Sequence, residues 1–527
     1  MIDTGDNTVI RRACHTGQRL HLDRKCRTSD CRSIVMHNGQ RGADEWQVIV
    51  VGAGNAGLCA GVAALQAGAT SVAVLDAAPK NLRGGNSSLT RTMRFAWRGS
   101  SFIASLLGEA HRGRVDEILA GQQGYTEEQY LEDWLRVSGD QVDVALIKSI
   151  IDRSNSTIAW MRDFGQRWAP RPKPLPGDVP IVLDGGGEGL QNRNFTQFER
   201  LGGTILYDSR VTGFEKAPDG RYLIRGPGTV FPLFADSLVL ASAGFEANPR
   251  MREHHLGEQW RNVKLRGVPF NDGAPLAAAI EFGADTAGSW EECHATPQGI
   301  KLPDYMLPGQ MHKSHGLARY AFPWGIVVNR HGRRFFDESG EYSNLSYVTL
   351  GQNILKQPDG IAFQIFDNKV VEAGVLPDGY LGDPTAVVAE SIEEGARRLG
   401  IDVENLVAEV RRLNSEGNDT VPATRDATTR TPKRLDTPPF LFSPVVCGLT
   451  FTYGGLSVTA NAEVRGGGEP IDGLYAAGVI VGGLYHHGYP GGTGLMAGAV
   501  LGRAAGMAAA AHAIRMGGTT SADNLAR

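Results

Sequence analysis

The sequence predicts a doubly wound α/β domain that is discontinuous in the chain and is interrupted by an inserted α+β domain. Three observations favour this fold. Residues 48–76 have the pattern of a strand, a glycine-rich turn, a helix and a second strand. The composition changes over residues 261–437, and strand-and-glycine patterning returns from residue 438. A domain that begins early and is completed by the end of the chain has this organisation.

The first unit reads VIVVGAGNAGLCAGVAALQAGATSVAVLD from Val48 to Asp76. Gly52 permits the tight turn, Gly54 lets backbone approach a pyrophosphate, and Gly57 lets the helix pack closely on the strand. The helix N-terminus offers free N–H groups and a partial positive charge to phosphates. Asp76 ends the second strand, where its carboxylate can accept hydrogen bonds from ribose hydroxyls. The unit therefore predicts a bound adenine dinucleotide.

Composition excludes several classes of protein. The chain has 527 residues, a formal net charge of −4 and six cysteines. No overall basic surface suggests nucleic acid, and the cysteines are too sparse for a disulfide framework, so a reducing cytoplasm is expected. The longest apolar stretch, near the C-terminus, contains Arg503. We therefore expect no transmembrane segment, and the first residues lack the apolar core of a secretory signal.

Residues 1–45 differ from the rest because they are polar and show no sustained helical or strand period. They are predicted to be a disordered leader, or translated sequence upstream of a start at Met36. Cys14, His15, His21, Cys26 and Cys31 lack the CxxC or HxxxH spacing of a zinc site, so metal binding is not predicted there.

Residues 46–260 are predicted to form the first part of the nucleotide-binding domain. The sequence RGGNSS at residues 83–88 makes a backbone-rich loop that is able to wrap a diphosphate or a sugar. Short strands follow over residues 204–245, and the last of them runs into Gly244. These strands complete the first lobe.

Residues 261–437 are predicted to form the inserted capping domain. Ser391 and Glu394 make a capping box for one helix, and Asp402 begins a second helix with one apolar stripe. Residues 438–515 are predicted to be the second part of the nucleotide-binding domain, and residues 516–527 a flexible tail. In the second part, GYPGGTGL leads into a long helix of small residues, whose N-terminus would stabilise negative charge at the site.

Taken together, the motifs resemble those of the fumarate reductase and succinate dehydrogenase flavoprotein family, and within it most closely those of the tricarballylate dehydrogenases. The resemblance covers residues 46–512 and rests on VIVVGAGNAGLCAG, RGGNSS, LASAGFEAN, CHAT, NRHGRRFFDE, TFTYGGL, GLYAAG and GYPGGTGL. It implies a noncovalent FAD, a Rossmann-like FAD-binding domain and a cap that closes over substrate.

The resemblance also assigns the FAD contacts, motif by motif. One departure is that Val479 follows Gly478 where the family has a Glu that holds the ribityl chain. The expected contacts are Gly52, Ala53, Gly54, Asn55, Ala56, Gly57, Asp76, Ala77, Gly85, Asn86, Ser87, Val211, Gly244, Gly478, Gly492, Thr493, Gly494 and Leu495.

The active-site motifs depart further from the fumarate reductases. No Arg follows Asp337 and Glu338 at the position of the family's proton donor. Phe451 replaces a His, and Tyr489 replaces an Arg, whereas His294 matches the family's substrate-site His. Because another residue type cannot reproduce the paired hydrogen bonds of a guanidinium, fumarate itself is not the expected substrate.

Tyr489 matches the tyrosine of tricarballylate and 3-ketosteroid dehydrogenases, in which a base removes one proton while the flavin accepts a hydride. We expect Tyr489, His294 and Tyr342 to form the catalytic set; an alternative is that Tyr489 only packs against the flavin or hydrogen-bonds to it. The expected substrate-binding residues are Arg266, Arg333, His486 and His487. No metal is expected at His486 and His487, because neighbours in an extended segment point to opposite sides.

The expected activity is that of an FAD-dependent oxidoreductase acting on a C–C bond activated by a carboxylate or a carbonyl. Dehydrogenation is favoured over reduction. A 3-ketosteroid-type dehydrogenase and a noncatalytic flavin electron-transfer subunit are the alternatives. The chain has no evident second dinucleotide motif. An electron-transfer protein, a quinone or oxygen is therefore expected to reoxidise the flavin.

Overall fold

Two sheets and a layer of helices organise the chain in the computed structural model, which describes residues 42, 44–172, 179–310, 315–416 and 434–523. The described residues from Asp44 onward belong to one compact unit. The predicted leader at residues 1–45 lies almost wholly outside the described residues.

The first sheet has eight strands and carries the predicted dinucleotide motif. Its order is β19–β20–β10–β1–β2–β7, with β9 beside β10 and β8 beside β9. The central strands run parallel, and their last residues are in register, with Val51 opposite both Leu75 and Leu240. In a doubly wound sheet, ligands bind beyond this carboxyl edge. The strands are β1 (Glu45–Val51), β2 (Val72–Leu75), β7 (Thr204–Leu206), β8 (Gly213–Lys216), β9 (Tyr222–Arg225), β10 (Leu233–Leu240), β19 (Glu463–Gly466) and β20 (Glu469–Ala476).

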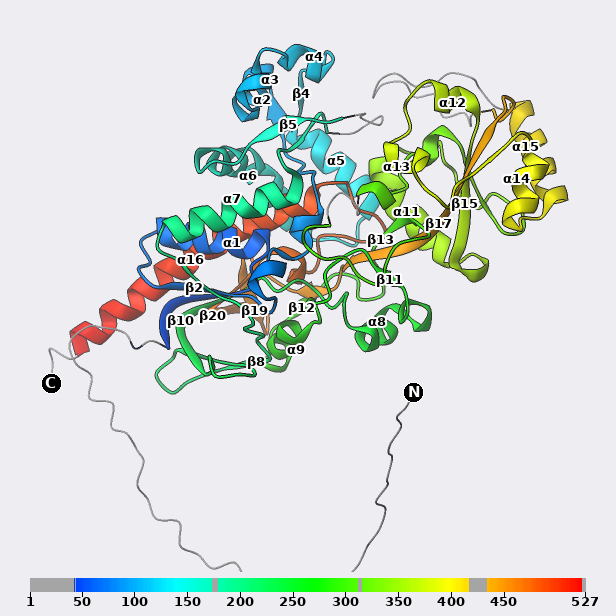
Figure 1. The fold of residues 1–527 in the computed structure, drawn as a ribbon. Coiled ribbons are helices and arrows are strands. Elements are labelled where there is room, and N and C mark those ends of the chain that lie inside the picture. The colour runs from blue at the N-terminus through cyan, green and yellow to red at the C-terminus, as the bar shows by residue number, and fades with distance from the viewer. Residues whose placement is uncertain (1–41, 43, 173–178, 311–314, 417–433, 524–527) are drawn as a thin grey trace, which may run out of the picture. The chain divides into compact units, whose positions relative to one another are not determined.

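Helices α1 (Asn55–Gln66), α7 (Gly186–Arg200) and α16 (Thr493–Asp523) lie side by side over this sheet (Figure 1). Glycines allow α16 to approach α1 closely. A Cβ at Gly502 would lie 2.3 Å from the carbonyl oxygen of Ala56, and one at Gly506 would lie 2.0 Å from that of Ala60. The C-terminal helix is thereby built into the nucleotide-binding lobe, as predicted from its small residues.

Helix α16 has the length and composition of a membrane-spanning helix in spite of Arg503. Residues Thr493–Gly517 are long and apolar enough to cross a membrane by length and composition, and this is the one such helix among the described residues. However, 61% of its apolar window is buried inside the protein, as expected for a core helix. The helix also continues through residues 516–523, which the sequence assigned to a flexible tail.

The second sheet has six strands and is centred on β17 (Phe440–Thr452), which pairs with β11, β13, β15 and β16. This orange strand reaches from α14 and α15 to the middle of the molecule (Figure 1). Residues 440–452 thus belong to the sheet of the insertion, whereas the sequence placed them with the second part of the FAD-binding domain. The other strands of this sheet are β11 (Lys264–Leu265), β13 (Cys293–Gly299), β14 (Ile326–Asn329), β15 (Ile361–Phe366) and β16 (Val387–Ala389).

Two helices beside this sheet begin where the sequence predicts. Ser391 accepts a hydrogen bond from the backbone N–H of Glu394 (3.1 Å) at the start of α14 (Ile392–Leu399). Asp402 accepts one from the N–H of Asn405 (2.9 Å) at the start of α15 (Val403–Glu416). Further helices are α2 (Ser100–Leu106), α3 (Glu109–Arg112), α4 (Val115–Leu119), α5 (Glu127–Ser138), α6 (Val144–Asp163), α8 (Pro249–Leu256), α9 (Ala274–Glu281), α11 (Ser343–Leu355), α12 (Asn368–Glu372) and α13 (Asp378–Leu381). Three two-stranded sheets pair β3 (Trp97–Arg98) with β4 (Gly124–Tyr125), β5 (Trp168–Pro170) with β6 (Ile181–Leu183), and β12 (Thr286–Ala287) with β18 (Gly455–Leu456).

Candidate active site

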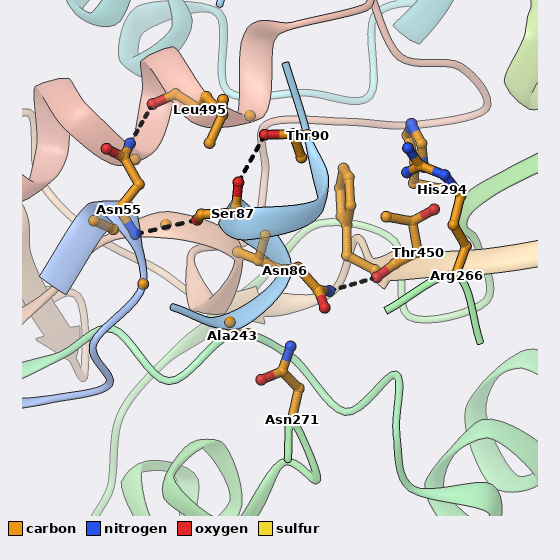
Figure 2. A pocket seen from close by; sticks show the side chains of 18 of the residues that line it. Asn55, Asn86, Ser87, Thr90, Ala243, Arg266, Asn271, His294, Thr450 and Leu495 are labelled. Carbon is orange, nitrogen blue, oxygen red and sulfur yellow. Dashed lines mark hydrogen bonds between the residues drawn. The ribbon is translucent and has the colours of Figure 1, made fainter. Parts of the chain in front are cut away.

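One continuous cavity extends from the carboxyl edge of the first sheet to the faces of β13, α11 and β17 (Figure 2). At one end it is lined by the glycine-rich turn after β1, the end of β2 and the RGGNSS loop. At the other end it is lined by Arg266, His294, Tyr347, Phe451 and Tyr489. We call these the cofactor end and the substrate end.

At the cofactor end, the three glycines of the first motif have different tasks. Gly52 has φ +108°, and a Cβ there would lie 2.4 Å from the carbonyl oxygen of Ala241. A Cβ at Gly57 would lie 1.8 Å from the oxygen of Gly52, so this glycine sets the packing of helix on strand. Gly54 has room in the protein, since its nearest neighbour is Ser87 Oγ at 3.6 Å. Its missing side chain therefore leaves space in the cavity, where a pyrophosphate would approach.

Asp76 offers a hydrogen-bond acceptor to the cavity. Its Oδ1 accepts from the N–H of Ala78 (3.1 Å), while its Oδ2 is buried without a hydrogen-bond partner. Burial raises the pKa of this carboxyl to about 6, against the lowering effect of the Ala78 N–H. Ribose hydroxyls would satisfy the orphaned oxygen and favour the carboxylate. The glycine cradle and this acceptor fit an adenine dinucleotide.

The RGGNSS loop is hydrogen-bonded both to the first turn of α1 and to β17 in the second sheet (Figure 2). The N–H of Asn55 donates to Ser87 Oγ (3.1 Å), and the Asn55 amide donates to the oxygen of Leu495 (2.9 Å). Asn86 donates from Nδ2 to the oxygen of Thr450 on β17 (3.0 Å) and accepts at Oδ1 from the N–H of Val268 (2.8 Å). The loop thus joins the cofactor end to the sheet of the insertion.

Most of the predicted cofactor residues line the cavity; Gly57, Gly244 and Thr493 do not. Gly57 instead packs helix against strand, and a Cβ at Gly244 would meet Thr452 Oγ1 at 2.2 Å, so this glycine faces β17. Thr493 is buried and donates to the oxygen of Pro490 (2.8 Å), which closes the turn before α16. These three act through packing and turn geometry.

His294 lies at the centre of the substrate end. It is 4% exposed, and its Nε2 is 2.8 Å from the hydroxyl of Tyr347. Its ring stacks on Phe451 at 4.6 Å and meets Tyr489 edge-on at 4.5 Å. Burial, assisted by the charge of Arg266, holds the pKa of His294 well below its usual value. The imidazole is therefore neutral at ordinary pH and can accept a proton.

Tyr489 accepts a hydrogen bond at its hydroxyl from the N–H of Gly494 in the first turn of α16 (2.7 Å). The donor expected from this helix N-terminus is thus in place. Burial nevertheless dominates and raises the pKa of Tyr489 above its usual value. The phenol is neutral, so in this geometry it is set to donate its proton rather than to act as a base.

Arg266 carries a positive charge into the substrate end. It follows β11, is 9% exposed, and its backbone N–H donates to the oxygen of Leu449 (2.7 Å). Its Nε is buried without a hydrogen-bond partner, and no ion pair joins its guanidinium to any residue of the described chain. By contrast, Arg210, which also lines the cavity, is paired with Asp272. Figure 2 shows Arg266 beside His294.

The remaining predicted residues lie away from the cavity lining. Tyr342 is the residue before α11, and Arg333 is exposed in a turn where it contacts Asn405 (3.4 Å). His486 and His487 precede Tyr489 but contact Glu292 instead of the cavity. Their predicted roles in catalysis and substrate binding are therefore not supported by their placement.

Sequence reasoning missed Tyr347, although a signal for it exists. Tyr347 lies four residues after Ser343 on α11, so both residues share one face of the helix. Both line the cavity. That face packs tightly on β13, where a Cβ at Gly351 would lie 2.6 Å from Ala295 backbone. A helical period read from Ser343 would have placed Tyr347, rather than Tyr342, beside His294.

Comparison with known proteins agrees with this geometry. The family model described as FAD binding domain (FAD_binding_2) matches residues 47–495. A probable fumarate reductase Ifc3 from Shewanella frigidimarina (strain NCIMB 400) is 26% identical over 492 residues, covering 89% of this chain and 75% of that protein. A 4-oxocyclohexanecarboxylate 2-dehydrogenase from Sinomonas cyclohexanicum is 28% identical over 433 residues, covering 76% and 67%.

Among solved structures, the 3-ketosteroid-Δ4-(5α)-dehydrogenase from Rhodococcus jostii RHA1 has the same fold. It superposes with a TM-score of 0.66 at 23% identity, covering 90% of this chain and 98% of that chain. The noncovalent attachment of the cofactor and the particular likeness to tricarballylate dehydrogenases stay predictions. The chain belongs to the FAD binding domain family, FAD_binding_2, together with fumarate reductase flavoproteins, and it is an FAD-dependent oxidoreductase acting on CH–CH groups.

Proposed function

We propose that the protein is a dehydrogenase that oxidises a C–C single bond next to the carboxylate or carbonyl group of a flat, ring-containing substrate. The observation that carries this proposal is the buried guanidinium of Arg266. It has an unpartnered Nε and no carboxylate partner in the described chain. A buried charge is costly unless a partner compensates it, so an anionic or strongly polar substrate group is the fitting ligand.

The walls of the substrate end support a ring rather than an extended dicarboxylate. Tyr320, Tyr347, Phe451 and Tyr489 all line it. Aromatic faces at this density contact flat apolar surface well and offer few hydrogen bonds. A substrate with one anionic or carbonyl end and an apolar ring body matches one cation and four aromatic side chains.

Bound FAD would supply the hydride acceptor, and the residues around it would supply orientation and proton transfer. Arg266 would hold the substrate carboxylate or carbonyl oxygen. Tyr489, whose oxygen accepts the Gly494 N–H, would donate its own proton to the oxygen that gains negative charge. His294 would take the proton from the carbon next to that group at Nδ1, while its Nε2 hydrogen-bonds to Tyr347.

The relatives include both reductases and dehydrogenases, so direction needs its own support. Fumarate reductases are among the curated relatives, whereas 4-oxocyclohexanecarboxylate 2-dehydrogenase acts, by its name, in the other direction. Neutral His294 has an unprotonated ring nitrogen for the proton that leaves the substrate, and it is not the imidazolium that could donate a proton during reduction. An electron-transfer protein, a quinone or oxygen would then reoxidise the cofactor.

Anaerobic reduction of the flavin tests the proposal. We expect 4-oxocyclohexanecarboxylate or a related cyclic keto acid to bleach the flavin absorbance, and succinate and tricarballylate to fail. If only dithionite reduces the flavin, and the reduced protein is reoxidised by enoates, the direction is reduction. If a 3-ketosteroid alone bleaches it, the substrate is an uncharged ring ketone and the proposed contact of Arg266 with an anionic group is wrong. If no organic compound acts in either direction, the chain is an electron-transfer subunit.

A further inference from the structure

We propose that Glu292, His486 and His487 form a binding site for a divalent transition-metal ion such as Zn²⁺, outside the catalytic cavity. The nitrogen and oxygen atoms that these side chains can offer all lie within 4.8 Å of one another. This is the one such His, Cys, Asp and Glu cluster found in the described chain, and none of the three residues lines the cavity.

The backbone at His487 explains how two adjacent histidines face the same carboxylate. Neighbours in an extended segment would point to opposite sides, but His487 has φ +58°, a left-handed conformation that is rare outside glycine. The two rings are consequently 3.7 Å apart. His487 Nδ1 lies 2.6 Å from Glu292 Oε1, and His486 Nε2 lies 3.5 Å from Oε2. The prediction that no metal binds here assumed an extended segment at His486 and His487, and the backbone conformation of His487 shows that this assumption is wrong.

The surrounding chain holds these ligands in place. The backbone N–H of His487 donates to Glu292 Oε2 (2.6 Å). Gln352 on α11 donates both to the oxygen of Cys293 (3.0 Å) and to that of His487 (3.3 Å). The hydroxyl of Tyr453 donates to the oxygen of Gly488 (3.3 Å). Glu292 and the histidine loop are thus fixed to the same supports before any ion binds.

The chemistry of the set fits zinc and similar ions. Two imidazoles and one carboxylate, with water in the fourth position, make a common tetrahedral zinc site. His486 is buried, whereas the His487 side chain is 63% exposed, so an ion can enter from solvent. Magnesium and calcium prefer oxygen ligands and are not expected here.

The place of the site in the fold suggests what the ion would do. Glu292 lies two residues before His294, and His487 lies two residues before Tyr489. An ion held by Glu292 and the histidines would join the two segments that carry the His294–Tyr489 contact of 4.5 Å. The ion would therefore position these two side chains without touching substrate.

Calorimetric titration of the full-length, FAD-loaded, chelator-treated protein with Zn²⁺ tests the site. We expect one binding event that weakens at least tenfold in Glu292→Gln, which preserves side-chain volume, and in His487→Asn, which keeps a smaller polar side chain. His254→Ala is the matched control, because His254 also neighbours a histidine, with ring centroids 4.6 Å apart, yet belongs to no such cluster. This control is expected to bind zinc as the unaltered protein does.

Two checks distinguish zinc bound at these three residues from zinc bound by cysteines and from loss of the fold. Co²⁺ bound by Cys14, Cys26 or Cys31 would give thiolate charge-transfer absorption, whereas nitrogen and oxygen ligands would not. Retained FAD absorbance shows that a variant is folded. If His487→Asn loses FAD, the zinc affinity of Glu292→Gln alone tests the site. Unchanged zinc affinity in the folded variants, or no stoichiometric binding by the unaltered protein, would mean that the three residues form only an ion pair and would overturn the proposal.

Discussion

The two ends of the cavity are built by different means. The cofactor end uses backbone, glycines and one carboxylate from short continuous motifs, with Gly52, Gly54 and Asp76 all within one βαβ unit. The substrate end uses side chains from six separate segments, including Arg266 after β11, His294 on β13 and Tyr489 before α16. Recognition of the dinucleotide is therefore local in sequence, whereas the chemistry depends on tertiary structure.

The charges of the two ends also differ. The cofactor end holds the acid Asp76, whose pKa burial raises to about 6. The substrate end holds the cation Arg266 and a histidine whose pKa burial depresses. Asp76 Oδ2 and Arg266 Nε are both buried without a hydrogen-bond partner. A ribose hydroxyl could supply the missing partner at the cofactor end, and a substrate carboxylate or carbonyl could supply it at the substrate end.

The largest effect is expected from replacing Gly54 or Gly57 at the cofactor end, and the two replacements should act on different properties of the protein. Gly54→Ala should abolish FAD binding while leaving the fold stable, because its Cβ has room in the protein and projects where pyrophosphate must approach. Gly57→Ala should instead lower the free energy of unfolding by at least ~1–3 kcal/mol, since its Cβ would overlap the oxygen of Gly52. Flavin absorbance and urea denaturation distinguish the two. Equal FAD content in Gly54→Ala and the unaltered protein would contradict the assigned role.

Removal of the cation tests the substrate end. Arg266→Met should lower kcat/KM for an anionic substrate by roughly 10²–10³-fold, the cost of losing a buried charged contact. FAD content should not change. The free energy of unfolding of the substrate-free protein should stay the same or rise, because an uncompensated buried charge is removed. A fall in FAD content or in the free energy of unfolding of Arg266→Met would show that Arg266 acts on the fold rather than on the substrate.

Glu246 offers a test at the junction of the two ends. It accepts at Oε1 from Asn86 (3.2 Å) and Asn271 (2.8 Å), and burial raises its pKa from 4.5 to about 7. The folded protein therefore binds this proton more tightly than the unfolded chain. The resulting stabilisation is full below pH 4.5 and is lost as the pH rises through 7, a difference of about 3 kcal/mol. Glu246→Gln should remove this loss in urea denaturation of the FAD-free protein at pH 5 and pH 8.

His294 should give the opposite dependence of the free energy of unfolding on pH in the same urea denaturation experiment. Its pKa is lower in the folded protein than in the unfolded chain, so the unfolded chain binds the proton more tightly. Stability should therefore fall as the pH drops below 6.5, and His294→Gln should remove that fall. Identical pH profiles for both variants and the unaltered protein would show that neither group is buried as described.

The contrast between the ends explains what the sequence could predict. The turn at Gly52, the strand that ends just before Asp76 and the helix that begins at Thr493 depend on local backbone preferences, so their places beside the cavity follow from spacing alone. The sequence identified Arg266 only as one of several possible substrate-binding cations. Arg210 forms an ion pair with Asp272 whereas Arg266 has no such partner among the described residues, and this difference depends on the tertiary structure. Tyr347 was missed because the side of α11 that meets β13 is fixed by packing.

Tyr489 brings the two ends together, since α16 contacts the cofactor end and Tyr489 faces the substrate end. Tyr489→Phe should lower kcat by about 10²-fold, the usual contribution of a positioned proton donor, with unchanged FAD content.

Tyr347→Phe, which removes only the hydroxyl that supports His294, should lower kcat less, by roughly tenfold. It should also shift the pH profile of kcat/KM because His294 loses its hydrogen-bond partner. Comparable losses in both variants would mean that the two hydroxyls act as one unit, and full activity of Tyr489→Phe would reduce Tyr489 to a packing residue beside His294 and Phe451.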